Sequence, residues 1–198
     1  MHPKIIFDLS EVLIYGLVGV EKSLVKALHI PEIEILRCFG GDPLQEICRG
    51  QITEEMYLQQ ILALHRWDLP VETLKQQIRG NFHSEVEGTR SILVHLAKKH
   101  DVFLLSDHAR EWIEYIQSIH PFLGEFKQAF FSYELGKTKK DPETFTEVLR
   151  RLACQPKDCW LIDDSAENIA VAASIGINGI RFENADQLRK QLVKQLLW

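Results

Sequence analysis

Three aspartates, each placed after a short apolar run, are the residues of this sequence best suited to chemistry. Asp8 follows Ile5-Ile6-Phe7, and the adjacent Asp163 and Asp164 follow Trp160-Leu161-Ile162. Ligands of an open parallel sheet bind at the carboxyl ends of its strands, and this arrangement brings such acids together. Neighbouring carboxylates repel one another and are tolerated where a hard cation or a chemical duty requires them. The pattern therefore predicts a magnesium enzyme.

Two further polar residues stand where a phosphate group would need them. Ser106 ends an apolar run and precedes a predicted helix, so its hydroxyl and the following amides can bind phosphate oxygens. Lys139 precedes a helix predicted from Pro142, where it can offset the carboxylates and hold phosphoryl oxygens. The alternatives are a plain helix cap for Ser106 and a solvated basic loop for Lys139. Asp8 is the candidate nucleophile, because an aspartate can attack phosphorus and form an aspartyl-phosphate.

The elements that position these residues follow from the hydrophobic pattern. A first strand is predicted at residues 4–9, and after Gly88 helices alternate with strands. Such alternation indicates βαβ units and a parallel sheet. The predicted helices are 89–99, 110–119, 142–152, 165–174 and 186–196, and the predicted strands are 102–105, 129–131, 159–162 and 179–182.

Residues 19–88 have a different character and carry no strong strand pattern. Helices are predicted at 20–28, 32–38, 53–64 and 71–80, separated by proline- and glycine-containing breaks such as Gly40-Gly41-Asp42-Pro43. Thr53 is the predicted N-cap of the third of these helices. We therefore expect an α/β fold, with a doubly wound, Rossmann-like parallel-sheet core of residues 1–15 and 88–198. Residues 16–87 would form a small inserted helical cap over the crevice.

Composition narrows the class of protein. With 198 residues and 45% hydrophobic content, the chain has material for one good core. A net charge of −5 argues against a nucleic-acid partner. No apolar run approaches a membrane span, and the first residues predict a strand rather than a secretory signal. We expect a cytoplasmic monomer or homodimer with reduced cysteines and no membrane partner.

Taken together, these residues resemble the haloacid dehalogenase-like (HAD) hydrolase superfamily, whose four motifs occur in order. The first, a strand ending in DxDx(T/V), is similar to Asp8-Leu9-Ser10-Glu11-Val12. The second is a strand ending in Ser106, and the third is Lys139 before a helix. The fourth is Asp163-Asp164, followed by Asn168 and Gly176. The cap segment Arg49-Gly50-Gln51-Ile52-Thr53-Glu54-Glu55 is similar to one in sugar-phosphate phosphatases.

The resemblance implies Mg²⁺-dependent hydrolysis of a small phosphorylated metabolite of the sugar-phosphate class. Asp8 would attack phosphorus, and Lys139 and Ser106 would assist as catalytic residues. The implied phosphate-binding residues are Ser106, Asp107 and Lys139. The implied metal ligands are Asp8, Ser10 through its backbone carbonyl, Asp164 and Asp163, with Asp163 behind Asp164.

One position departs from the family pattern where it matters most. Most phosphatases of the family carry a second aspartate as general acid–base two residues after the nucleophile, and Ser10 stands there. A serine hydroxyl has far too high a pKa for that role, whose loss typically costs on the order of 10²–10⁴ in rate. One reading is a weak or specialised phosphatase that takes esters with good leaving groups, such as glycosyl 1-phosphates. Glu11 and His108 are candidate replacements for the proton donor. The alternative is that Glu11 is a solvent-facing glutamate and His108 a surface histidine, without a role in the reaction.

Two other readings stay open at this stage. A 2-haloacid dehalogenase also lacks the second aspartate, but that branch resembles a DxYGT motif, and this chain has neither the tyrosine nor the Gly-Thr. That branch also carries asparagine where this chain has Asp107. Alternatively, the chain has kept the fold, lost turnover and binds a metabolite or a protein. Departures at Ser10, Glu11, Asp107 and Lys140 favour that reading, whereas the retained acids and lysine oppose it.

Aromatic residues of the cap and of one core helix have two possible roles. Tyr57, Trp67, Phe82 and His83 are predicted to pack the cap helices, with substrate contact as the alternative. Trp112 and Tyr115, three residues apart on a predicted helix, are expected in the core.

Overall fold

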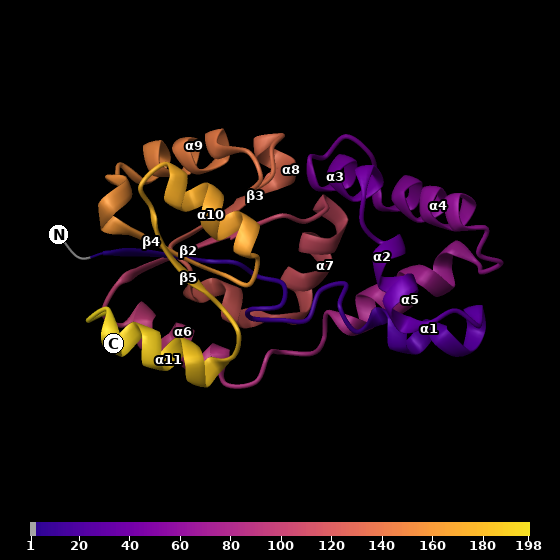
Figure 1. The fold of residues 1–198 in the computed structure, drawn as a ribbon, viewed down its shortest axis with the longest axis horizontal. Helices are drawn as coiled ribbons and strands as arrows, with labels where there is room; N and C mark the ends of the chain where they lie inside the picture. Colours follow the sequence, from indigo (N-terminus) through magenta and orange to yellow (C-terminus); the bar gives the residue numbers. More distant parts are fainter. Residues whose placement is uncertain (1–2) are drawn as a thin grey trace.

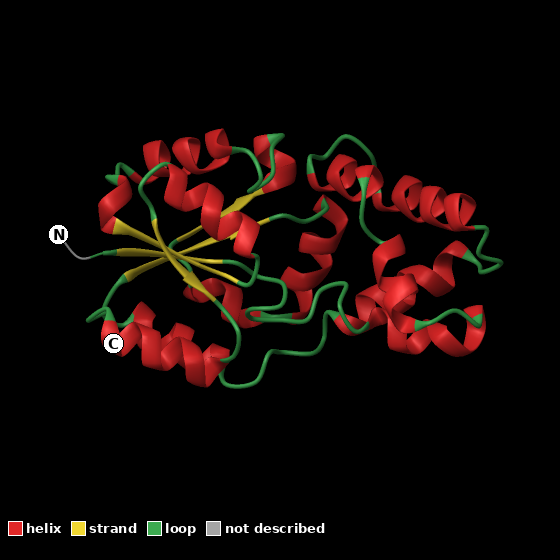
Figure 2. Ribbon diagram, viewed as in Figure 1, coloured by secondary structure: helices red, strands yellow, loops and turns green. Residues whose placement is uncertain are grey.

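A five-stranded, all-parallel sheet forms the centre of the protein (Figure 2), in a computed structural model that describes residues 3–198. The strand order is β3-β2-β1-β4-β5, so the chain winds outward from β1 in both directions. Phe7 of β1 pairs with Leu104 of β2 and Ile162 of β4, which aligns the carboxyl ends of the three central strands. The strands are β1 (Lys4–Phe7), β2 (Asp101–Ser106), β3 (Gln128–Phe131), β4 (Cys159–Asp163) and β5 (Asn178–Arg181). The predicted α/β class is confirmed.

Helices cover both faces of the sheet (Figure 1). Ile5 and Phe7 point into one hydrophobic cluster, and Ile6 points into the other, as the two-residue period of a strand requires. The first cluster is closed by α6 (Thr89–Ala97), α7 (Arg110–Ile119) and α11 (Ala185–Lys194). The second is closed by α9 (Pro142–Leu152) and α10 (Ala166–Ser174).

Five helices lie together beyond the carboxyl ends of the strands, on the right in Figure 1. They are α1 (Val20–Leu28), α2 (Glu32–Cys38), α3 (Asp42–Cys48), α4 (Glu54–His65) and α5 (Val71–Asn81). Thr53 caps α4 as predicted, its hydroxyl accepting the Met56 N–H at 3.2 Å. We call α1–α5 the cap; its exact limits at residues 16–87 stay a prediction.

Some sequence-based boundaries were wrong. The Gly40–Pro43 segment was predicted as a break, yet α3 begins inside it, because proline is well tolerated in the first turn of a helix. β1 ends at Phe7 rather than at residue 9, so Asp8 stands just past the strand. α11 ends at Lys194 rather than at 196, and Leu196 has a left-handed φ of 60° that no helix continues. The short elements not predicted are η1 (Pro121–Glu125), α8 (Ser132–Leu135) and η2 (Pro156–Asp158).

A buried carboxylate ties the cap to the core. Glu54, at the start of α4, is 2% exposed and accepts hydrogen bonds from Arg79 of α5 and from Trp112 Nε1 of α7, the latter at 3.0 Å. Trp112 is buried and packs edge-on against Tyr57 and Phe82, so these rings pack together as predicted; Phe82 and Trp112 also line a cavity between cap and sheet. This contact fixes one wall of the crevice between cap and sheet.

Across residues 3–198, the helices are all too short or too polar to cross a membrane. The four cysteines are free thiols.

Candidate active site

The three predicted aspartates meet at the carboxyl end of the sheet. β1 and β4 are neighbours, and the Asp8 N–H donates to the Ile162 carbonyl at 2.9 Å, continuing the ladder past the strand. One oxygen from each of Asp8, Asp163 and Asp164 lies within 4.8 Å of the others. Asp8 and Asp163 are buried, and Asp164 is half-buried. The structure thus brings the three predicted carboxylates together.

Lys139 lies between two of these acids. Its Nζ is 2.6 Å from Asp8 Oδ1 and 2.7 Å from Asp163 Oδ2, and the side chain is buried, so a solvated basic loop is ruled out. The backbone N–H of Lys139 donates to the Asp107 carboxylate at 3.0 Å, which holds the loop before α9. Burial alone lowers the pKa of Lys139, but Asp163, Asp8 and Asp107 more than reverse this, so the pKa lies above its usual range. The ammonium is therefore charged at any physiological pH.

Asp163 is held by donors on several sides. Besides Lys139, its carboxylate accepts the Ser165 N–H at 2.9 Å and the Asn168 side-chain amide at 3.1 Å, both from the start of α10. Ser165 caps that helix through the Asn168 N–H. Four hydrogen bonds fill most of the acceptor capacity of a carboxylate. Asp163 is thus placed to orient Lys139 and Asn168, in agreement with the expectation that it stands behind Asp164.

The acids outnumber the cation that faces them. Burial raises the pKa of Asp8 well above its usual value, Lys139 opposes this, and Asp163 adds to it. Burial and Asp163 likewise raise the pKa of Asp164. Mg²⁺ takes oxygen ligands at about 2.0–2.1 Å in an octahedron, for which a cluster of carboxylate oxygens of this size is suited. The residues present therefore fit Mg²⁺ by their oxygen chemistry, spacing and excess negative charge.

A histidine links the position of the missing acid to the second motif. His108 Nε2 is 2.9 Å from Ser10 Oγ, and His108 Nδ1 is 2.5 Å from Ser106 Oγ. The expectation of a surface histidine was wrong, since His108 is 4% exposed and its backbone N–H donates to the Ser132 hydroxyl oxygen. Burial, with a contribution from Lys139, lowers the pKa of His108 to about 3, so the ring is neutral near pH 7. His108 was predicted only as a candidate proton donor, and a two-residue spacing from Ser106 does not by itself predict this contact.

Glu11 stands where the family that this chain resembles usually has glycine. Its backbone conformation explains that preference. Its φ is 59°, in the left-handed region, which costs a non-glycine residue about 1 kcal/mol or more. Its Oε1 accepts the N–H groups of Gly16 and Val18 at 2.9 and 3.3 Å, which offsets that cost. Burial raises the pKa of Glu11 to about 7. Its side chain is thus engaged with the loop that enters the cap.

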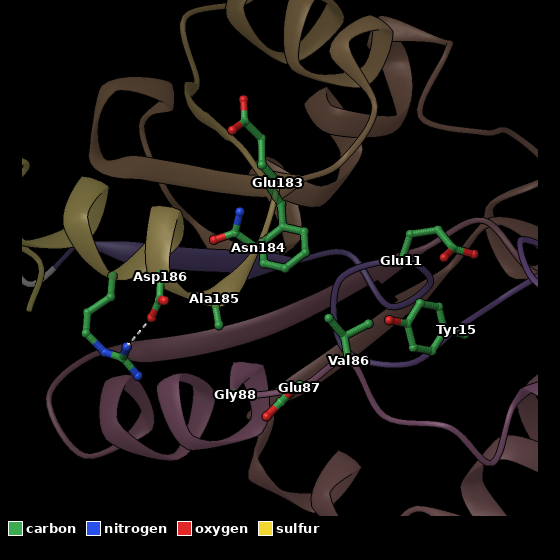
Figure 3. Close-up of a pocket in the computed structure, with 11 residues that line it drawn as sticks. Glu11, Tyr15, Val86, Glu87, Gly88, Glu183, Asn184, Ala185 and Asp186 are labelled. Atoms are coloured by element: carbon green, nitrogen blue, oxygen red, sulfur yellow. Dashed lines mark hydrogen bonds and ion pairs between the residues drawn. The ribbon is translucent and has the colours of Figure 1, made fainter.

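Two cavities adjoin this loop. The larger, about 540 Å³, lies between the loop, the 86–88 segment and the start of α11, and Figure 3 shows Glu11, Tyr15 and Asn184 around it. Glu11 is the one residue that it shares with the candidate site. The smaller, about 260 Å³, lies between cap and sheet and is lined by Ser10, Asp107 and His108. The smaller cavity therefore adjoins the candidate site.

Comparison with known proteins agrees with the motifs and the fold. The chain is 31% identical over 163 residues to flavin mononucleotide hydrolase 1 of Arabidopsis thaliana, covering 82% of this chain and 66%, just under two thirds, of that protein. It is 25% identical over 154 residues to D-ribitol-5-phosphate phosphatase of Bacteroides thetaiotaomicron, covering 75% of each. A HAD family enzyme of that bacterium, solved with magnesium and inorganic phosphate, superposes with a TM-score of 0.70 at 22% identity, covering 93% of this chain and 96% of that one.

The family model for haloacid dehalogenase-like hydrolases matches residues 5–176, a range that runs from β1 to the turn after α10 and contains every motif named above. The protein is a member of the haloacid dehalogenase-like hydrolase family.

Proposed function

We propose that this protein is a Mg²⁺-dependent phosphatase that hydrolyses a small phosphorylated metabolite through an aspartyl-phosphate on Asp8. The observation that carries the proposal is the buried Lys139 ammonium, bridging Asp8 and Asp163 at 2.6 and 2.7 Å beside Asp164. The names of the two curated relatives, a flavin mononucleotide hydrolase and a ribitol phosphate phosphatase, support a phosphate monoester as substrate.

Asp8 begins the reaction by in-line attack of a carboxylate oxygen on phosphorus. The new O–P bond forms as the bond from phosphorus to the alcohol oxygen breaks, and water then cleaves the aspartyl-phosphate, restoring Asp8 and releasing phosphate. Oδ1 of Asp8 is already bound by the Leu9 N–H at 2.7 Å and by Lys139, which fixes the carboxylate plane. Lys139 and the Ser106 hydroxyl would bind the phosphoryl oxygens, and Asp107 holds the Lys139 loop in place.

The metal set proposed from the family pattern is Asp8, the Ser10 carbonyl and Asp164, with Asp163 holding Lys139 behind them. A bound Mg²⁺ supplies positive charge against the phosphoryl oxygens and orients the ester. Ser10 and Ile14 form an isolated bridge that uses the Leu9 and Ile14 carbonyls, so the Ser10 carbonyl is not consumed by it.

Protonation of the leaving alcohol is the step for which the usual acid is missing. A neutral His108, hydrogen-bonded to both Ser10 and Ser106, can orient the Ser10 hydroxyl toward the alcohol oxygen, but it carries no spare proton. Glu11 is turned to the Gly16 and Val18 amides. We therefore expect a slow enzyme that prefers leaving groups needing little protonation.

The test is phosphate release from a panel of phosphorylated metabolites, with and without Mg²⁺, for the parent, Asp8→Asn and Asp68→Asn. Asp68 lies exposed in the cap and is the matched control. The panel pairs glycosyl 1-phosphates with 6-phosphates, so that leaving-group quality is varied within the predicted sugar-phosphate class. Release that needs Mg²⁺ and is lost only in Asp8→Asn supports the proposal. Equal activity in Asp8→Asn would eliminate the aspartyl-phosphate.

The non-catalytic alternative predicts a different pattern. In that case Mg²⁺ binding, measured by calorimetry, persists while no ester of the panel releases phosphate. The oligomeric state, monomer or homodimer, and the cytoplasmic location stay predictions; the Arabidopsis relative is named as chloroplastic.

A further inference from the structure

We propose that the alcohol released at this site is a small, neutral molecule with an apolar, ring-sized body. The proposal rests on the phosphatase function above and moves the substrate away from the sugar-phosphate class that the sequence suggested, and from substrates with a second anionic group. It is drawn from the 260 Å³ cavity between cap and sheet, which Ser10 and His108 help to line and which we take as the space for the group attached to the phosphate.

The walls of this cavity are mostly apolar. The cap contributes Leu17, Leu44 and Cys48, and burial raises the pKa of Cys48, which keeps it a neutral thiol. Phe82 and Trp112 supply aromatic surface, with ring centroids 5.8 Å apart at 63°. Such surfaces favour a compact apolar body and an aromatic ring in particular.

Several of the polar side chains that line the cavity are already bonded to one another. Gln45 Oε1 accepts the Thr138 hydroxyl at 3.4 Å, and Ser10 Oγ is paired with His108. Each hydroxyl of a polyol that enters without a partner loses its hydrogen bonds to water. The chain of hydroxyls in a sugar alcohol is thus poorly matched to these walls.

For a second phosphate or carboxylate, the two basic side chains at this end of the described structure already face carboxylates. Lys140, which lines the cavity, is 3.0 Å from Glu167, and Arg49 nearby is 3.6 Å from Asp141. Glu11 and Asp107 add carboxylates to the lining. A second anion on the alcohol would meet this acidic lining.

The volume of the cavity gives the size of the body that it can surround. At about 30 Å³ per water in the liquid, 260 Å³ corresponds to roughly nine waters, and so to a body on the order of ten non-hydrogen atoms. A single six-membered ring with a short linker fits inside, whereas a tricyclic flavin would extend beyond the cavity.

Binding and turnover test the inference separately. In the presence of Mg²⁺, calorimetry compares benzylphosphonate with methylphosphonate and phosphonoacetate, none of which is hydrolysed. We expect benzylphosphonate to bind at least about tenfold more tightly than either, since it alone buries a ring. In parallel, kcat/KM is measured for benzyl phosphate and ribitol 5-phosphate. Both release a primary alcohol, so the comparison reports on the cavity rather than on leaving-group quality.

The expected result is a kcat/KM at least about tenfold higher for benzyl phosphate than for ribitol 5-phosphate. Leu44→Asn should narrow that ratio, with Leu17→Asn as a second wall variant should the first fail to fold, and Leu64→Asn on the exposed side of α4 should leave it unchanged. Equal or better use of ribitol 5-phosphate overturns the inference and leaves the phosphatase standing. Preferred binding of benzylphosphonate without turnover of either ester overturns the phosphatase and leaves the cavity assignment standing.

Discussion

Replacing Lys139 with methionine isolates the charge at the centre of the site. Methionine keeps an unbranched side chain of comparable length and removes the ammonium that faces Asp8 and Asp163 at 2.6 and 2.7 Å. Removing one partner of a buried ion pair costs about 3–5 kcal/mol, because the other charge is left buried and unpaired. With about 2–4 °C per kcal/mol for a chain of this size, the Tm should fall by roughly 6–20 °C. Phosphate release should be abolished.

The loss of stability should depend on pH in a defined direction. The pKa of Lys139 is raised, so its stabilising contribution is present throughout the accessible pH range. In the variant the facing acids can shed their unpaired charge by binding protons, so the deficit should be largest near pH 8 and smaller near pH 5.

Urea unfolding of parent, Lys139→Met and Lys22→Met at both pH values measures this. Lys22 is exposed on α1, and its replacement should change the free energy of unfolding by no more than about 0.5 kcal/mol. A Lys139→Met protein as stable as the parent at pH 8 would refute the view that this lysine neutralises the acid cluster. A loss of stability that grows as pH falls would refute the view that unpaired carboxylate charge causes it.

Three further perturbations probe the same site. Ser10→Asp restores the usual acid, and general acid catalysis is worth about 10²–10⁴, so kcat for sugar 6-phosphates should rise; an unchanged kcat means that another step limits the rate. Gly16→Ala would place a methyl group 2.4 Å from Ser10 Oγ, so Ser10 must move; kcat and Tm should fall, whereas Gly124→Ala, with open space around it, should alter neither. The pKa values of Asp8 and Asp164 are raised without metal, so Mg²⁺ binding should release protons and tighten as pH rises. Calorimetry in buffers of different ionisation enthalpy measures the released protons, and a pH-independent affinity would contradict the third prediction.

The alternation of helices and strands after Gly88 could be predicted because the helices are amphipathic and the central strands are short apolar runs buried on both faces. β2, β4, α7 and α9 accordingly lie within one or two residues of their predicted bounds. The predictions failed where local turn and helix-end chemistry, rather than the hydrophobic pattern, decides the structure. α3 begins at Asp42, directly after two glycines and with Pro43 in its first turn, and α8 has only four residues, too few for a helical period to show.

The acids and Lys139 could be placed from sequence because strand ends in a parallel sheet converge on one edge. The role of His108 could not, since a histidine two residues past a strand carries no periodic signal. Its burial depends on Phe82, which is remote in sequence, as well as on Trp112 four residues further along; their rings lie 6.3 and 6.2 Å from it. The cavity and its apolar walls were equally out of reach, because they depend on how the cap sits against α7.

This chain departs from the family pattern in the loop after β1. The contacts that Ser10, Glu11 and Gly16 make in this loop depend on one another. Ser10 lacks the acid, but its hydroxyl is fixed by His108, and Gly16 approaches so closely that only a hydrogen fits beside Ser10. Glu11 adopts a left-handed backbone conformation, and its carboxylate accepts a hydrogen bond from the N–H of the same Gly16. Drift at a disused site would relax such contacts, since a strained residue persists only where its surroundings over-determine it. Under the proposed function, the departures at Ser10 and Glu11 are parts of a working site that protonates its leaving group weakly.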